Sequence, residues 1–245
     1  MLFKKINISI FSFFLVFIFL MKASDARGGD LENERLAEYV LSDDHWLYAN
    51  LDNIFSRRDV LENSTTFKEA GFVTLYKQPS GMMVAKHPAL PGYLVKVYFY
   101  SNPNCLESQW LLDRCEGAKN IRNLIEKEKL RYFSVPDKWI YFLPNQDQDI
   151  AILVVQDMKL VSREESKKAW KDANKQQLRE LYMILNHGFG SCYLCGNMPY
   201  TKIGKFACVD TAYPYRQHLY SNIKKYISAD RHGYWDQLVK SGENR

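Results

Sequence analysis

Hydrophobic and polar positions change period near Gly71. Before it, Glu32–Ala49 and Leu51–Val60 carry apolar side chains at helix-like spacing, which predicts two helices. Asp43 and the aspartate after it are candidate caps for the second part of this region. After Gly71 the apolar residues come in short runs that are separated by Gly- and Pro-containing turns. The pattern therefore predicts an N-terminal helical extension over 27–70, followed by a strand-rich region.

The strand-rich region has a definite order of elements. Three strand-like runs come first, then the helix Gln109–Lys129 with an apolar stripe, then two more runs. The five runs are Phe72–Tyr76, Met82–Lys86, Tyr93–Tyr100, Val135–Pro144 and Ile150–Asp157. The rest of the chain predicts helices over Glu164–Lys175 and Gln176–Leu185, a hairpin turning at Gly204, and one or two helices in the tail. The fold class predicted from this order is α+β.

The first residues predict export from the cytosol. A basic start, MLFKK, precedes the mostly apolar run Ile6–Met21, and small residues follow up to Ala26. This is the layout of a secretory signal peptide over residues 1–26, so we expect a secreted, periplasmic or luminal protein. An uncleaved anchor is the alternative, and only then is the membrane a partner; the run is somewhat shorter than the ~18 apolar residues of a span.

Composition narrows the function classes. The net charge of +5 is modest, and the basic residues are scattered rather than gathered into a stripe with aromatic ones, so nucleic acid is not an expected partner. Among the five cysteines, Cys192 and Cys195 form a C-x-x-C pair. A local disulfide or plain buried thiols are favoured over a redox or zinc site, because neither a thioredoxin-like context nor further ligands accompany the pair.

The candidate metal-binding residues lie on either side of a predicted hairpin, which is formed by Tyr200–Ile203 and Lys205–Val209. Asn197 lies just before it and Asp210 just after it, so both would sit at the same end of the two strands. An amide and a carboxylate at a strand end suit a hard cation such as Mg²⁺ or Mn²⁺, with phosphate oxygens completing the coordination.

This ordered set resembles the protein-kinase-like superfamily. Asn197 matches its metal-binding Asn, and Asp210, followed by Thr211, matches the Asp of D-F-G. Lys96, in the third strand, resembles the lysine that holds ATP phosphates, and Glu116 lies about where its helix partner stands. Residues 155–158, including Val155 and Asp157, would be the linker whose backbone binds the adenine.

The resemblance also has two departures. Cys192 occupies the position of the catalytic Asp, which leaves only His187 and Asp210 as nearby substitutes, and a single-glycine turn ending at Gly81 replaces the glycine-rich loop. The resemblance implies a five-stranded antiparallel N-lobe with one helix over 71–154 and a reduced, mainly helical C-lobe over 155–245.

The expected function is that of a small exported bacterial pseudokinase, a regulatory module that binds ATP with Mg²⁺ or Mn²⁺, or an unknown protein partner. The alternatives are an atypical ATP-dependent phosphotransferase acting on a protein or small-molecule hydroxyl, and a structural interaction protein without nucleotide.

Overall fold

A computed structural model describes residues 35–106, 109–144, 150–211 and 218–242. The chain divides into two compact units, residues 1–40 and residues 41–245, and the elements named below belong to the second unit. In the first unit, residues 35–37 are helical. The predicted signal peptide lies outside the described residues. Within the part of the chain that the structure describes, no helix has both the length and the apolar character needed to span a membrane.

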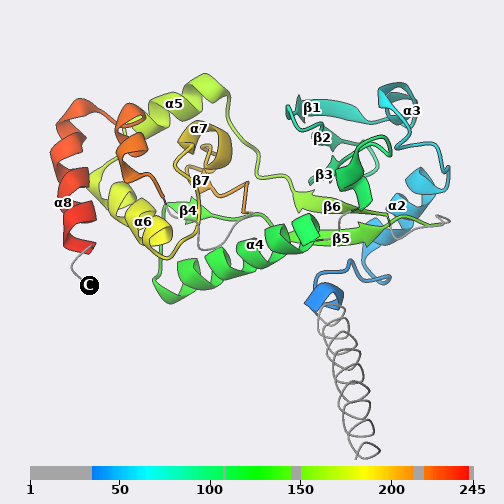
Figure 1. The fold of residues 1–245 in the computed structure, drawn as a ribbon, viewed down its shortest axis with the longest axis horizontal. Helices are drawn as coiled ribbons and strands as arrows, with labels where there is room; N and C mark the ends of the chain where they lie inside the picture. Colours follow the sequence, from blue (N-terminus) through cyan, green and yellow to red (C-terminus); the bar gives the residue numbers. More distant parts are fainter. Residues whose placement is uncertain (1–34, 107–108, 145–149, 212–217, 243–245) are drawn as a thin grey trace, which may run out of the picture. The chain divides into compact units, whose positions relative to one another are not determined.

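A five-stranded antiparallel sheet forms one half of the second unit (Figure 1). Its spatial order is β1 (Val73–Lys77), β2 (Met83–Lys86), β3 (Tyr93–Val97), β6 (Ala151–Gln156) and β5 (Lys138–Phe142). Each strand falls inside or within one residue of a predicted run. The predicted α+β class and the five-stranded antiparallel sheet are therefore confirmed.

Both faces of the sheet are covered near its centre. β6 lies between β3 and β5, and its first five residues are buried, as expected for a continuous apolar run with neighbours on both faces. On one face, Val95 and Val154 pack with apolar residues of α2 (Trp46–Phe55) and α3 (Ser64–Glu69). Residues 41–70 thus contribute to the same hydrophobic core as the sheet.

The helices of this region differ from the predicted ones. α2 runs through the expected break at Asn50, and its N-cap is His45 rather than an aspartate. The His45 Nδ1 atom accepts a hydrogen bond from the backbone N–H of Leu47 at 3.2 Å, while Asp44 instead accepts one from the Ser42 hydroxyl. The sequence pattern favoured the aspartates because they are commoner caps than histidine.

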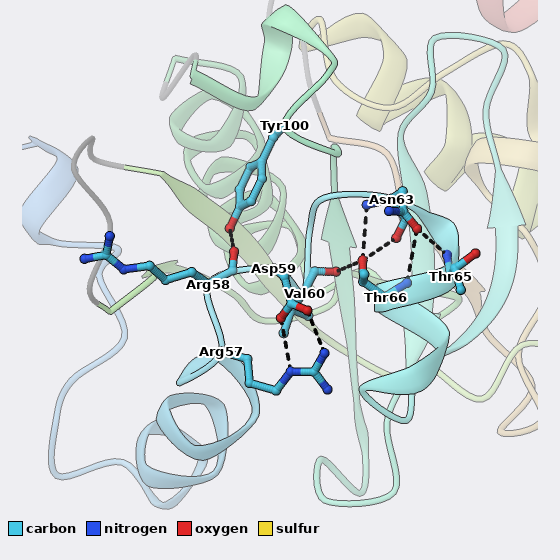
Figure 2. Close-up of polar contacts among 8 residues, drawn as sticks. All are labelled: Arg57, Arg58, Asp59, Val60, Asn63, Thr65, Thr66 and Tyr100. Atoms are coloured by element: carbon cyan, nitrogen blue, oxygen red, sulfur yellow. Dashed lines mark hydrogen bonds and ion pairs between the residues drawn. The ribbon is translucent and has the colours of Figure 1, made fainter.

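Polar contacts order the corner between α2 and α3, and one of them joins this corner to the turn that follows β3 (Figure 2). Asn63 caps α3 by accepting hydrogen bonds from the backbone N–H groups of Thr65 and Thr66, at 2.8 and 3.2 Å. The Tyr100 hydroxyl donates to the carbonyl oxygen of Arg58 at 2.9 Å. The ion pair of Arg57 with Asp59, at 2.7 Å, is exposed, so we expect it to add little stability.

Helix α4 (Gln109–Lys127) follows β3 through the short helix η1 (Pro103–Leu106) and extends from the sheet towards the helical half of the unit (Figure 1). Its buried side chains form one stripe, as predicted. Ile121 and Leu124, in its second half, belong to the core of the helical half.

That helical half contains α5 (Arg163–Lys171), α6 (Lys175–Asn186), α7 (Leu194–Asn197) and α8 (His232–Gly242), with the short helices η2 (Tyr220–Lys225) and η3 (Ala229–Arg231). Its core includes the fully buried Trp170, which stacks on Phe206 with ring centroids 3.7 Å apart.

The predicted hairpin is present in shortened form. β7 (Phe206–Ala207) pairs in parallel with β4 (Phe133–Ser134), and an isolated bridge joins Tyr200 to Phe206. Gly204 makes the turn with a φ of +82°, a conformation that glycine adopts without strain.

Candidate functional site

Two lysines from the sheet meet the segment that follows β7. Lys96 lies in β3 between Val95 and Val97, so it points away from the face covered by α2 and α3. Its Nζ atom donates to the carbonyl oxygen of Val209 at 3.2 Å. Lys138, the first residue of β5, donates to the same oxygen at 3.3 Å and to Thr211 Oγ1 at 2.6 Å. The two ammonium groups therefore converge on residues 209–211.

Helix α4 forms the other wall around this segment. Thr211 Oγ1 donates to the carbonyl oxygen of Arg114 at 2.5 Å, so the threonine links β5 to the helix. Gly117 allows the close approach, because a Cβ atom there would overlap the carbonyl oxygen of Thr211. The Thr211 hydroxyl thus attaches residues 209–211 to α4, and the absence of a side chain at Gly117 leaves room for them.

Asp210 supplies the negative charge of this cluster. Its Oδ1 atom lies 3.8 Å from a guanidinium nitrogen of Arg114. That oxygen is buried and has no hydrogen-bond partner among the described residues, and the same is true of the Arg114 Nε atom. Arg114 is held in place by the carbonyl oxygen of Trp110, at 3.2 Å, and by the face of that indole ring.

Burial dominates the electrostatics of the two lysines. It lowers the pKa of Lys96 from 10.5 to about 8; Asp210 partly offsets this effect, and Arg114 adds to it. Burial likewise lowers the pKa of Lys138 well below its ordinary value, and neighbouring Lys96 lowers it further. Burial thus destabilises both ammonium groups, and only one carboxylate, Asp210, is set against the positive charges of Lys96, Lys138 and Arg114. An additional anion at this position would relieve that imbalance.

The two predicted metal ligands lie on adjoining pieces of backbone. The carbonyl oxygen of Asn197 accepts a hydrogen bond of 3.0 Å from the N–H of Val209, next to Asp210. The Asn197 side-chain amide donates to Ser191 Oγ at 3.0 Å, which orients the side chain and leaves its oxygen for other contacts.

These residues fit a divalent cation only in part. The unpartnered Oδ1 of Asp210 suits a hard cation, but the described residues contain no group of three or more His, Cys, Asp or Glu side chains that could hold a metal. Asn197 and Asp210 would thus be its protein ligands, and phosphate oxygens and water would have to supply the others. The Arg114 guanidinium beside Asp210 competes with such a cation.

The other predicted site residues are placed as follows. Glu116 is on α4 and partly exposed, whereas the helix side chain beside Asp210 is Arg114. Val155 is within β6, which is paired on both edges, so only residues beyond Gln156 leave the sheet. The Asp157 carboxylate accepts hydrogen bonds from the backbone N–H of Lys159 at 2.9 Å and from its Nζ at 2.7 Å.

Cys192 is part of the hydrophobic core of the helical half, where it is 7 % exposed. All five cysteines are free thiols, so the structure pairs neither Cys192 nor Cys195 in a disulfide, and plain thiols are the alternative it supports. His187 is exposed at the end of α6, and its Nδ1 atom is 2.8 Å from the carbonyl oxygen of Met183. Neither side chain is arranged as a general base.

Sequence reasoning missed Lys138, Arg114, Thr211 and Gly117. The sequence did contain a sign of the role of Lys138: it is two residues before Ile140 in β5, so both side chains lie on the same face of the sheet, and both are buried. For Gly117 the signal was a glycine within the apolar stripe of α4, because glycine in a helix interior often marks a close approach.

No protein-family model and no curated protein matches this chain.

Proposed function

We propose that this protein is an exported, kinase-like module that binds a nucleotide through its phosphates, with Mg²⁺ or Mn²⁺, and that it regulates a protein partner. The observation that carries the proposal is the charge imbalance around Asp210, where Lys96, Lys138 and Arg114 surround one carboxylate. A polyphosphate chain would supply the missing negative charge, and charge-assisted hydrogen bonds to it would be strong in such a buried place.

The order of elements supports a kinase-like fold. Three strands of the five-stranded sheet precede α4, its other two strands follow that helix, and the helical half comes after them. Lys96 in the third strand and Asp210 after β7 are brought together, as the resemblance implies for the phosphate-holding lysine and the metal-binding aspartate. In this scheme the metal would neutralise phosphate charge, and Asn197 and Asp210 would hold it.

Binding is favoured over phosphoryl transfer because the sequence position that would supply the carboxylate for orienting the acceptor hydroxyl holds a cysteine. Cys192 occupies that position and is packed in the core. Loss of a positioned general base costs about 10²–10⁴ in rate. An atypical phosphotransferase with a protein or small-molecule hydroxyl as acceptor is the second candidate, since Lys96 and Asp210 are both in place. Export also separates the protein from cytosolic ATP, which is a further reason to expect regulation rather than turnover.

A specific observation favours the third candidate, an interaction protein without nucleotide. The two lysines already donate to Val209 and Thr211, so the protein partly satisfies its own cations. A phosphate ligand would have to add to these bonds or replace them.

Two assays separate the three functions. Thermal unfolding with ATP and MnCl₂ tests binding, because a ligand of the folded state at about 100 times its Kd adds ~2.7 kcal/mol of stability. Transfer of the labelled γ-phosphate to the protein itself or to a mixture of acceptors tests catalysis. We expect a metal-dependent rise in Tm without transfer. Transfer would establish the phosphotransferase, and an unchanged Tm at millimolar nucleotide would leave the interaction protein.

A further inference from the structure

A second cationic site lies in the helical half of the protein. A cavity of about 390 Å³ is bounded by α5, α7 and η2. Four of its lining side chains are basic, namely Arg163, Lys167, Lys171 and Lys225, and two are tyrosines, Tyr193 and Tyr226. Its volume is within the range of pockets that hold small organic ligands. Among the described residues that line it, none is an aspartate or a glutamate.

Helix α5 presents three of these cations on one face. Arg163, Lys167 and Lys171 are spaced four residues apart, so they follow one another along the helix. Lys167 pairs with Glu164 at 2.7 Å, but this carboxylate is 78 % exposed, and such a pair adds little and is readily exchanged for another anion. The helix therefore offers a row of positive charge to the cavity.

The opposite wall adds the fourth cation. Lys225 Nζ lies over the rings of Tyr193 and Tyr226, 5.3 and 5.1 Å from their centroids. These contacts hold the ammonium group beside aromatic faces without neutralising its charge. An anion in the cavity would meet positive charge from both walls.

The cavity is built on a fixed framework. Ser166, which is fully buried on α5, accepts a hydrogen bond from the N–H of Tyr200 at 3.0 Å. Trp170 Nε1 donates to the carbonyl oxygen of Met198 at 3.0 Å. These bonds attach α5 to the residues that follow α7, so the basic side chains stand on a wall that is organised before any ligand binds.

From these features we infer that the cavity binds a phosphate monoester. A compact dianion matches four basic side chains around a small volume, and the two tyrosines can contact the organic part of the ester. The ester is either a free small molecule or a phosphorylated side chain of another protein. Asn197 also lines the cavity, so this site adjoins the Asp210 site, but it does not depend on a nucleotide there.

Calorimetric titration with ribose 5-phosphate and with a phosphoserine peptide tests the inference. The variant Lys167→Glu/Lys225→Glu reverses one charge on each wall. The control, Lys168→Glu/Lys127→Glu, makes the same change in net charge at exposed positions outside the cavity. Circular dichroism checks that both variants are folded.

We expect saturable binding of at least one probe, weakened about tenfold or more by the cavity variant and by less than about twofold by the control. Tighter binding of the sugar phosphate or of the peptide identifies the source of the ester. Absence of saturable binding to the unaltered protein would overturn the inference. Equal weakening by both variants would also overturn it, because the attraction would then be a long-range effect of net charge.

Discussion

Lys138 Nζ donates a 2.6 Å hydrogen bond to Thr211 Oγ1, which itself donates to the carbonyl oxygen of Arg114 at 2.5 Å. One buried hydroxyl therefore satisfies a strand lysine and a helix carbonyl together. This places Asp210, the preceding residue, between the sheet and α4. The position of the carboxylate in the candidate site thus depends on a residue with no charge of its own.

The Thr211 hydroxyl can be removed at nearly constant volume. We expect Thr211→Val to lower the free energy of unfolding by ~1–3 kcal/mol, because the buried Lys138 ammonium group loses the shorter of its two hydrogen bonds and the Arg114 carbonyl oxygen loses the hydroxyl donor. Thr211→Ser keeps the oxygen and should retain more of the stability. Urea unfolding measures both variants. A Thr211→Val protein as stable as the unaltered one would show that these bonds contribute nothing.

Stability should depend on pH through the two buried lysines. Lys96 keeps its proton up to about pH 8 in the folded state, whereas the unfolded chain keeps it up to about 10.5. Between these values the unfolded state binds more protons, so the free energy of unfolding rises with pH. Lys138, whose pKa is also lowered by burial, acts in the same direction. Stability is thus expected to increase from pH 8 upwards.

Two buried thiols set the upper end of the pH range in which stability rises. Burial raises the pKa of Cys115 and of Cys208 from 9.0 to about 12, so above pH 9 the unfolded state binds fewer protons at these residues and stability falls. The rise should therefore be clearest between pH 8 and 9. Urea unfolding of Lys96→Met/Lys138→Met should show no such rise. A rise of equal size in this variant would assign the effect to other groups.

Gly117 tests the contact between α4 and residues 209–211. Gly117→Ala should destabilise the protein by about 1–3 kcal/mol or more, because the new methyl group meets backbone that cannot move aside. The matched control is Gly233→Ala in α8, where a Cβ meets nothing within 4 Å. This control should be neutral or up to ~1 kcal/mol more stable, since alanine favours the helix. Equal effects in the two variants, measured by thermal unfolding, would contradict the close approach.

Much of the sheet could be predicted from the sequence, because each strand is a short apolar run with a turn beside it. β6 and α4 are the clearest cases: one is apolar throughout, and the other has a single stripe. α2 was harder, because His45 is an uncommon cap and the helix continues past Asn50. β4 and β7 have two residues each, too few to show a period.

The candidate site was less predictable than the fold. Asn197 and Asp210 were predicted from their positions beside the hairpin and Lys96 from the kinase-like resemblance, and the structure has hydrogen bonds from the Lys96 side chain and to the Asn197 backbone at Val209. Arg114 was not predicted as a site residue because a charged residue on a helix usually faces solvent. The direction of its side chain depends on the rotation of α4 about its axis, which the sequence does not give. The role of Thr211 was not predicted because its partner Lys138 is distant in sequence and reaches it only in the folded protein.

Calorimetric titration of ATP in the presence of MnCl₂ tests the central claim most directly. It should be performed on the unaltered protein, on Lys96→Met, and on Lys86→Met, which removes an exposed lysine from neighbouring β2. We predict metal-dependent binding that Lys86→Met preserves and that Lys96→Met weakens by about 30-fold or more, since losing a buried charge partner costs ~2–5 kcal/mol. No binding at millimolar ATP, or equal binding by all three proteins, would contradict the claim.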